Sequence, residues 1–261
     1  MPQRRFRSSV LTMATIDLNS DLGEGAGTEA EIMPLITSAN IACGAHAGDE
    51  RSMRTAVVLA KANGVAVGAH PGYRDPANFG RKALDIPPDE LVGDLVAQIE
   101  TLFAIASSES VPVAHVKAHG ALYNTAQRDE SVAAAIVRAV DQSARGLVLF
   151  VFPGSAVERA AREAGLRVAR EGFIDRVYEA DGALRSRTLD HSLITDPAKA
   201  AAQAVSFMRD GGVRAYDGSF LEQAVDTLCV HGDTPGAPNI LRAARAALVA
   251  AGVHVERLRA G

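Results

Sequence analysis

The sequence predicts a single α/β barrel in which parallel strands form the wall and helices cover the outside. Short apolar or β-branched runs alternate with helical stretches along the chain, a pattern typical of strand–helix units. The 261 residues, 48% of them hydrophobic, suffice for one core of this size. No Gly/Ser-rich linker or charge block marks a second domain, so we expect one domain at 15–261 after a disordered extension at 1–14.

Seven runs have the length and composition of strands, and an eighth is predicted at the end of the chain. They are residues 15–21, 39–43, 65–70, 113–119, 147–152, 167–173, 227–233 and 253–258. Between the second and third runs, an amphipathic helix begins after the candidate N-cap Asp49 and stops at Gly64. A longer helix is predicted from Leu91 to Ala106, where apolar residues recur at helical spacing. Seven or eight such units indicate a closed or nearly closed barrel.

The composition excludes several classes of partner. A formal net charge of -4 and a pI near 6.0 provide no basic field for nucleic acid or for an anionic membrane surface. No run of about 18 apolar residues predicts a membrane span. Two cysteines are too few for a disulfide scaffold, so we expect a reducing cytoplasm.

Polar residues share one parity of several strands, mostly near the strand ends. The set comprises Asp17, Asn19 and Asp21 in the first strand, His115, Lys117 and His119 in the fourth, and Cys229, His231 and Asp233 in the seventh. A period of two places each group on one face of the sheet. Because the apolar parity must meet the covering helices, the polar parity is expected to point into the barrel or its mouth.

The second and third strands end in the same way. Ala42 and Gly44 precede His46, and Ala66 and Gly68 precede His70, again at period two. Small residues below each histidine are interpreted as room for a ligand. Any one of these histidines taken alone could be a turn cap, but four of them with several carboxylates at strand ends indicate one site.

Parity also separates three ambiguous residues. Cys43 falls on the parity opposite His46, so we expect it to face the helices as a small hydrophobe and not as a nucleophile. Cys229 shares the inward parity but lies deeper in its strand, and we interpret it as structural. Asp49 has two open interpretations, because it could reach the pocket or cap its helix.

Six ordered motifs resemble the LamB/YcsF family over residues 15–258. They are IDLNSDLGEG, NIACGAHAGD, GAHPGY, VKAHGALYN, EGFIDRVY and CVHGDTPGA. The family pattern has Phe where Ala45 stands, Pro where Ala118 stands and Pro where Glu50 stands. Each departure lies beside a candidate site residue and bears on pocket shape and substrate preference.

The resemblance implies a seven-stranded β/α barrel of the glycoside hydrolase/deacetylase type. It further implies an enzyme that hydrolyses 5-oxo-L-proline to L-glutamate in an ATP-dependent 5-oxoprolinase, together with partner subunits B and C. ATP is then a co-substrate of the complex, whereas this chain contains no GxxxxGK[ST] and no GxGxxG motif. Opening the unreactive lactam needs a base, an acid and an activated carbonyl, and the substrate carboxylate needs a cation such as Lys117 or Arg176.

The predicted site residues lie around one cavity at the C-terminal mouth of the barrel. The candidate catalytic residues are Asp17, Asp21, Glu24, His46, His70, His119, His231 and Asp233. The candidate substrate-binding residues are Asn19, Asn40, Asp49, Lys117, Glu171, Asp175 and Arg176.

Two other functions stay open from the sequence. The first is a metal-dependent deacetylase of N-acylated sugars, whose divalent metal ligands would be Asp21, His46, His70 and His231. The second is a non-catalytic protein that binds a small acid and assembles the complex. Stoichiometric metal with ATP-independent amide hydrolysis would identify the first of these functions.

Overall fold

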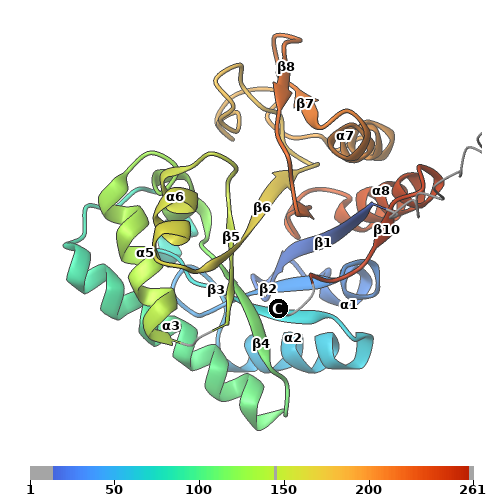
Figure 1. Cartoon of the computed structure of the whole chain (residues 1–261). Coiled ribbons are helices and arrows are strands. Elements are labelled where there is room, and N and C mark those ends of the chain that lie inside the picture. The colour runs from blue at the N-terminus through green and yellow to red at the C-terminus, as the bar shows by residue number, and fades with distance from the viewer. Residues whose placement is uncertain (1–13, 144–145, 259–261) are drawn as a thin grey trace, which may run out of the picture.

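Seven parallel strands close into a barrel, as predicted (Figure 1). The computed structural model describes residues 14–143 and 146–258, so the predicted extension at 1–14 lies outside the described residues except for Ala14. The wall strands are β1 (Thr15–Leu22), β2 (Ser38–Ala42), β3 (Ala66–His70), β4 (Val113–Lys117), β5 (Val148–Val151), β6 (Arg167–Phe173) and β9 (Thr227–Cys229). They pair in this order, and β9 also pairs with β1, which closes the wall.

The predicted eighth strand does not become an eighth strand of the barrel wall. The segment forms a two-residue strand, β10 (His254–Val255), which pairs in parallel with the start of β1. Thr15 lies opposite His254, whereas the wall contact between β1 and β9 begins at Asp17 opposite Thr227. Because β9 occupies the rest of that edge, β10 pairs only with Thr15 and Ile16 at the start of β1.

Helices cover the outside of the wall (Figure 1). They are α1 (Glu29–Ile32), α2 (Glu50–Asn63), α3 (Pro88–Ser108), α4 (Gly120–Thr125), α5 (Glu130–Ser143), α6 (Ala156–Glu163), α7 (Pro197–Arg209) and α8 (Ala237–Ala250), with 3-10 turns η1 (Met33–Leu35) and η2 (Pro76–Asn78). By length and composition α3 could cross a membrane. Its apolar face, including Leu91, Leu95 and Ile99, is buried in the core and the helix packs against α5, as a core helix of a globular domain does.

An excursion between β6 and β9 departs from the simple strand–helix alternation. After α7 the chain forms an antiparallel hairpin of β7 (Gly212–Arg214) and β8 (Phe220–Glu222), which projects at the top of Figure 1. Each strand has only three residues, shorter than the runs of four to eight that a periodic signal requires. This hairpin was therefore absent from the predicted elements.

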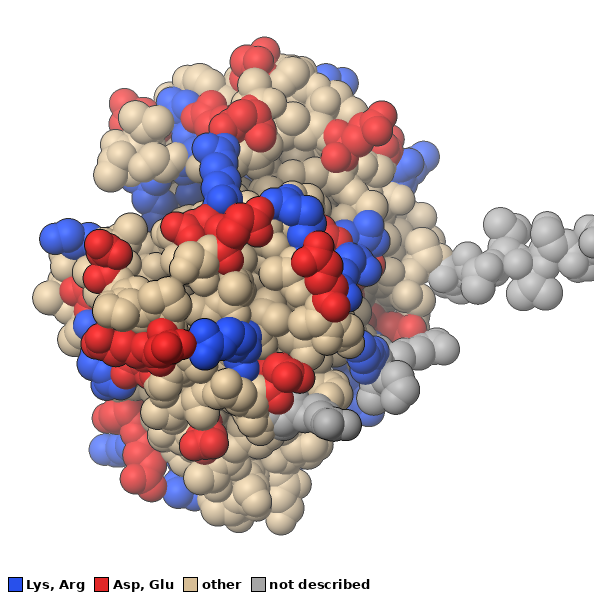
Figure 2. Space-filling view, turned by 60° about the vertical axis from the view of Figure 1, so that its left-hand side comes forward, with Lys and Arg blue, Asp and Glu red and all other residues tan. Residues whose placement is uncertain are grey.

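The barrel separates an apolar layer from a polar interior, as the strand parity predicts. Leu18, Ile41 and Val116 point outward into the apolar layer beneath the helices. Cys43 lies in the same layer, where burial raises the pKa of its thiol to about 12. Inside the wall, the described apolar cluster is small and centres on Phe150, and the remaining interior is polar and buried. On the outer surface, acidic and basic side chains intermingle (Figure 2).

Candidate active site

Asp17 lies deepest in the barrel and does not line the cavity that sequence reasoning assigned to it. Its carboxylate accepts hydrogen bonds from Thr37 (2.7 Å), Ser38 (2.7 Å) and Thr227 (2.5 Å). Burial, only partly offset by these bonds, raises its pKa. The residue shares the parity of Asp21 but sits near the start of β1, so it ties β1, β2 and β9 together below the site.

A second layer supports the site from below. The Asn40 amide donates to Asn19 Oδ1 and to Asp21 Oδ1, both at 2.8 Å, and His115 Nε2 lies 2.8 Å from Asn40 Oδ1. Neither asparagine lines the cavity, so the prediction that they contact substrate is wrong. Their hydrogen bonds instead position Asp21.

Gly68 explains how the histidine of this layer fits. A Cβ at this position would lie 2.0 Å from His115 Nε2, so only glycine leaves space for the ring. The small residue below His70 therefore accommodates a side chain of the neighbouring strand and not a ligand, contrary to the sequence-based interpretation.

Lys117 forms a buried ion triad at the base of the cavity. Its ammonium lies 2.8 Å from Asp21 Oδ1, 2.8 Å from Glu171 Oε1 and 3.2 Å from Cys229 Sγ. Burial alone would lower the lysine pKa, but Asp21 and the other acidic neighbours raise it well above its ordinary value. Burial likewise works against ionised Asp21, yet His70 and Lys117 hold its pKa well below 3.8. Lys117 and Asp21 therefore stay charged. Glu171 contacts the lysine and does not line the cavity.

His231 and Asp175 form a histidine–carboxylate pair close to Asp21. His231 Nδ1 lies 2.9 Å from Asp175 Oδ2, which also accepts from the Thr234 hydroxyl at 2.6 Å and from the His231 amide at 3.0 Å. Burial would raise the Asp175 pKa, but His231 and these hydrogen bonds lower it to about 2. Asp175 therefore orients the ring through Nδ1 and leaves Nε2 for the cavity.

Four more predicted residues meet beside this cavity. Glu24, His46, His70 and His119 place one ligand atom each within 4.8 Å of one another. His46 and His119 stack with parallel rings whose centroids are 3.7 Å apart. Burial, more than Glu24 can offset, lowers the pKa of His46 to about 4. Glu24, His46 and His119 follow β1, β2 and β4, and His70 ends β3, so the structure brings these four strand ends together.

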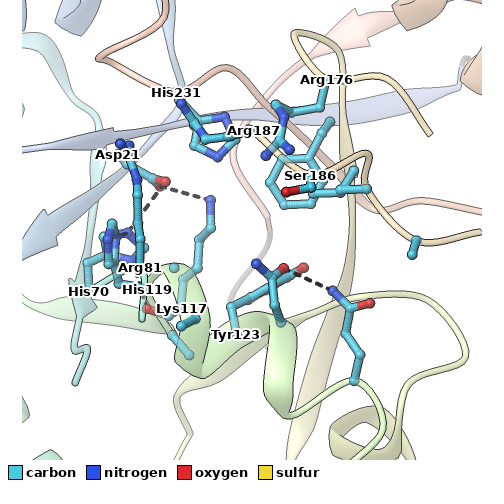
Figure 3. A pocket seen from close by; sticks show the side chains of 18 of the residues that line it. Asp21, His70, Arg81, Lys117, His119, Tyr123, Arg176, Ser186, Arg187 and His231 are labelled. Atoms are coloured by element: carbon cyan, nitrogen blue, oxygen red, sulfur yellow. Dashed lines mark hydrogen bonds and ion pairs between the residues drawn. The ribbon is translucent and has the colours of Figure 1, made fainter. Parts of the chain in front are cut away.

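The cavity has a volume of about 480 Å³. Its polar lining includes Asp21, His70, Arg81, Lys117, His119, Tyr123, Arg176, Ser186, Arg187 and His231. Figure 3 shows Asp21, His70 and His119 on one side and Arg176 and Ser186 on the other. The lining therefore combines acid–base groups with an excess of cations.

Arg176 lacks a carboxylate partner among the ion pairs of the described residues. Its guanidinium is buried and donates to the carbonyls of Arg185 (2.6 Å) and Ser192 (3.4 Å). Burial and then repulsion by Arg187 lower its pKa to about 10. Asp233, predicted to be catalytic, instead binds Arg81 and Arg187 at the cavity edge.

Sequence reasoning missed several cavity residues, among them Arg81, Tyr123, Ser186 and Arg187. Arg81 and Arg187 come from long loops without periodicity, so the sequence pattern does not reveal them. Tyr123 belongs to the VKAHGALYN motif and could have been predicted from it. Asp49 does not reach the cavity. It is the exposed N-cap of α2 and exchanges side-chain and backbone hydrogen bonds with Ser52 in a capping box.

Known proteins resemble the chain over nearly its whole length. The model of the LamB/YcsF family matches residues 16–261. A Symbiobacterium thermophilum protein, named as the A subunit of 5-oxoprolinase, is 51% identical over 92% of this chain and 94% of its own length. A Pyrococcus furiosus protein of the same name is 44% identical over 92% of this chain and 96% of its own. The solved lactam utilization protein of Thermus thermophilus superposes with a TM-score of 0.87 at 46% identity, covering 94% of this chain and 100% of that one.

Proposed function

The chain belongs to the LamB/YcsF family, and on that premise we propose that it is the A subunit of an ATP-dependent 5-oxoprolinase. The reaction is hydrolysis of the cyclic amide 5-oxo-L-proline to L-glutamate, carried out with partner subunits B and C. The observation that carries the proposal is the pairing, in one cavity, of an oriented histidine base with a buried arginine that lacks a carboxylate partner among the described residues.

His231 is the group proposed to move protons. Since Asp175 accepts the Nδ1 proton, the neutral ring carries its lone pair at Nε2, where it can take a proton from an attacking water. The same nitrogen can then return the proton to the leaving ring nitrogen of the lactam. Asp175 stays ionised with a pKa of about 2 and stabilises the imidazolium formed between these steps.

Arg176 is proposed to bind the substrate carboxylate, with Arg187 at the same wall. A buried guanidinium whose described contacts are carbonyl oxygens gains a charge-assisted hydrogen bond when an anion enters. Lys117 is less suited to this role, because Asp21 and Glu171 already neutralise it. Its permanent charge is better placed to stabilise negative charge on the lactam oxygen.

ATP use is proposed to reach this chain through its partners. Phosphorylation of the lactam oxygen would activate the carbonyl toward water, and the chain carries no P-loop sequence for such a transfer. We therefore place nucleotide binding on the assembled complex, which we expect to work in the cytoplasm. The relatives are themselves named as subunits, which supports a multi-subunit enzyme.

A reconstitution assay tests this function. Glutamate release from 5-oxoproline is followed with the three subunits and ATP, and each component is left out in turn. We expect turnover only with all components present. Efficient turnover by the isolated chain with ATP would contradict the proposal that ATP use depends on the partner subunits. ATP-independent release of acetate from N-acetylated sugars would identify a deacetylase instead. A non-catalytic scaffold would keep full turnover when His231 is replaced by Asn.

A further inference from the structure

Two imidazole nitrogens and one carboxylate oxygen converge next to the cavity. His119 Nδ1 lies 3.0 Å from His70 Nε2 and 3.2 Å from Glu24 Oε1, and His70 Nε2 lies 3.7 Å from the same oxygen. All three side chains are almost fully buried. Water therefore cannot screen their lone pairs from one another.

The proton positions on both rings are fixed from outside this cluster. His70 Nδ1 lies 2.8 Å from the Lys117 carbonyl oxygen, and His119 Nε2 lies 2.9 Å from the Phe79 carbonyl oxygen. A carbonyl oxygen only accepts, so each of these outer nitrogens carries the proton. When both rings are neutral, the inner nitrogens carry lone pairs that face each other. His70 Nε2 also lies 3.4 Å from Asp21 Oδ2, so a proton and a metal ion compete for the position beside this nitrogen. Outer hydrogen bonds of this kind fix the tautomer of metal-binding histidines in known sites.

We propose that Glu24, His70 and His119 bind one divalent transition-metal ion through Oε1, Nε2 and Nδ1. A single proton held between the two rings would leave His46 as the main hydrogen-bond donor to the Glu24 oxygen. One cation serves all three atoms together. Metal–ligand bonds near 2.1 Å in a tetrahedral site place the ligand atoms about 3.4 Å apart, close to the spacing of the three atoms.

His46 is placed to hold the carboxylate and not the ion. Its Nε2 lies 3.2 Å from Glu24 Oε1, so it donates a hydrogen bond to the ligand oxygen. Its ring is parallel to that of His119 within 1°, so the two lone-pair directions run side by side and do not converge on one point. Gly72 and Gly80 allow this stacking, because a Cβ at either position would lie within 2.9 Å of an atom of His46.

The donor set favours zinc or a neighbouring ion over magnesium or calcium. Two imidazole nitrogens and one carboxylate oxygen suit Zn²⁺, Co²⁺ or Mn²⁺, whereas the hard cations prefer all-oxygen sites. Two histidines and one glutamate also match catalytic zinc sites that keep a fourth position open for water. His70 and His119 line the cavity, so that position faces the proposed substrate.

A second acidic group in the barrel does not need such an ion. Asp21, Cys229 and His231 also approach one another, but the Lys117 ammonium already lies 2.8 Å from Asp21 and 3.2 Å from Cys229. His231 is engaged by Asp175. The four metal ligands considered from sequence, Asp21, His46, His70 and His231, are thus divided between two clusters.

Metal binding to the isolated full-length chain tests the site. The chain is treated with a chelator, titrated with Zn²⁺ or Co²⁺, and analysed for bound metal and for visible Co²⁺ absorption. We expect about one ion per chain and the absorption of tetrahedral Co²⁺. Glu24→Gln and His119→Asn should abolish stoichiometric binding, and His46→Ala should weaken it about 10- to 100-fold, as loss of an outer hydrogen bond does.

His254→Gln is the matched control, because it removes an exposed histidine on β10 and should leave binding unchanged. Circular dichroism establishes that each variant is folded. The proposal is overturned if the wild-type chain retains no ion, or if folded Glu24→Gln and His119→Asn bind as the wild type does. If a ligand variant unfolds, the wild-type stoichiometry and the His46→Ala affinity decide the matter. Because the readout is binding, it stands whether or not the proposed lactam reaction is correct.

Discussion

Replacing Lys117 by Met removes the only cation that is ion-paired with both Asp21 and Glu171 in the described interior. Asp21 keeps His70 Nε2 at 3.4 Å and the Asn40 amide as partners, whereas Glu171 loses its ion pair. The Glu171 carboxylate is then buried without compensation, so its pKa must rise or the fold must loosen. Removing one partner of a buried ion pair costs about 3–5 kcal/mol. For a chain of this length, that loss lowers the melting temperature by about 6–20 °C.

The loss of unfolding free energy in Lys117→Met should grow as the pH rises. In the variant, the uncompensated Glu171 is expected to have a folded-state pKa above that of the unfolded chain, about 4. Such groups destabilise the fold increasingly as pH rises above the unfolded value, and the penalty vanishes when both states are protonated. Denaturant unfolding of wild type and Lys117→Met at pH 7 and pH 5 should therefore give the larger difference at pH 7.

A second substitution distinguishes this charge effect from loss of packing. Adding Glu171→Gln to Lys117→Met removes one uncompensated charge while keeping its shape, so the double variant should regain part of the stability at pH 7. Equal stability of wild type and Lys117→Met at pH 7, or no recovery in the double variant, would refute the argument from the buried triad.

Three further outcomes are expected. Asp175→Asn should reduce glutamate release by the reconstituted complex about 100-fold or more without unfolding the chain, because His231 loses the negative charge that stabilises its imidazolium form. Unchanged turnover would contradict the proposed role of His231. Cys43→Ala should cost about 1 kcal/mol in denaturant unfolding and leave turnover intact. Asp49→Ala should cost about 1 kcal/mol through loss of the α2 cap; a selective rise in KM would instead return Asp49 to the substrate site.

Strand parity predicted which side chains enter the barrel, but parity alone does not say at which depth the cavity begins. Asp17 and Asp21 share a parity in β1, yet Asp17 lies beneath the site and Asp21 lines the cavity, because four residues separate them along the strand. His231 and Asp233 lie beyond the end of β9, and the turn there sends one to the cavity wall and the other to arginines at its edge.

Residues contributed by loops could not be inferred from periodicity. Arg81 and Arg187 reach the cavity from segments in which no repeating pattern fixes a side-chain direction. Asp49 shows the opposite case, since a local signal was present. Ser52 stands three residues after it, a spacing that permits reciprocal capping, and this local bond decides its orientation.

The double pairing of β9 determines when the site can exist during synthesis. Residues Thr227–Cys229 are the only segment of the described chain that joins β1 to β6, so both strands keep open edges until nearly nine-tenths of the chain has emerged from the ribosome. Unpaired edges of parallel strands are exposed to wrong partners in folding intermediates. Until then, the charged interior is only partly enclosed. Synthesis of β9 closes the wall, and His231 follows two residues later.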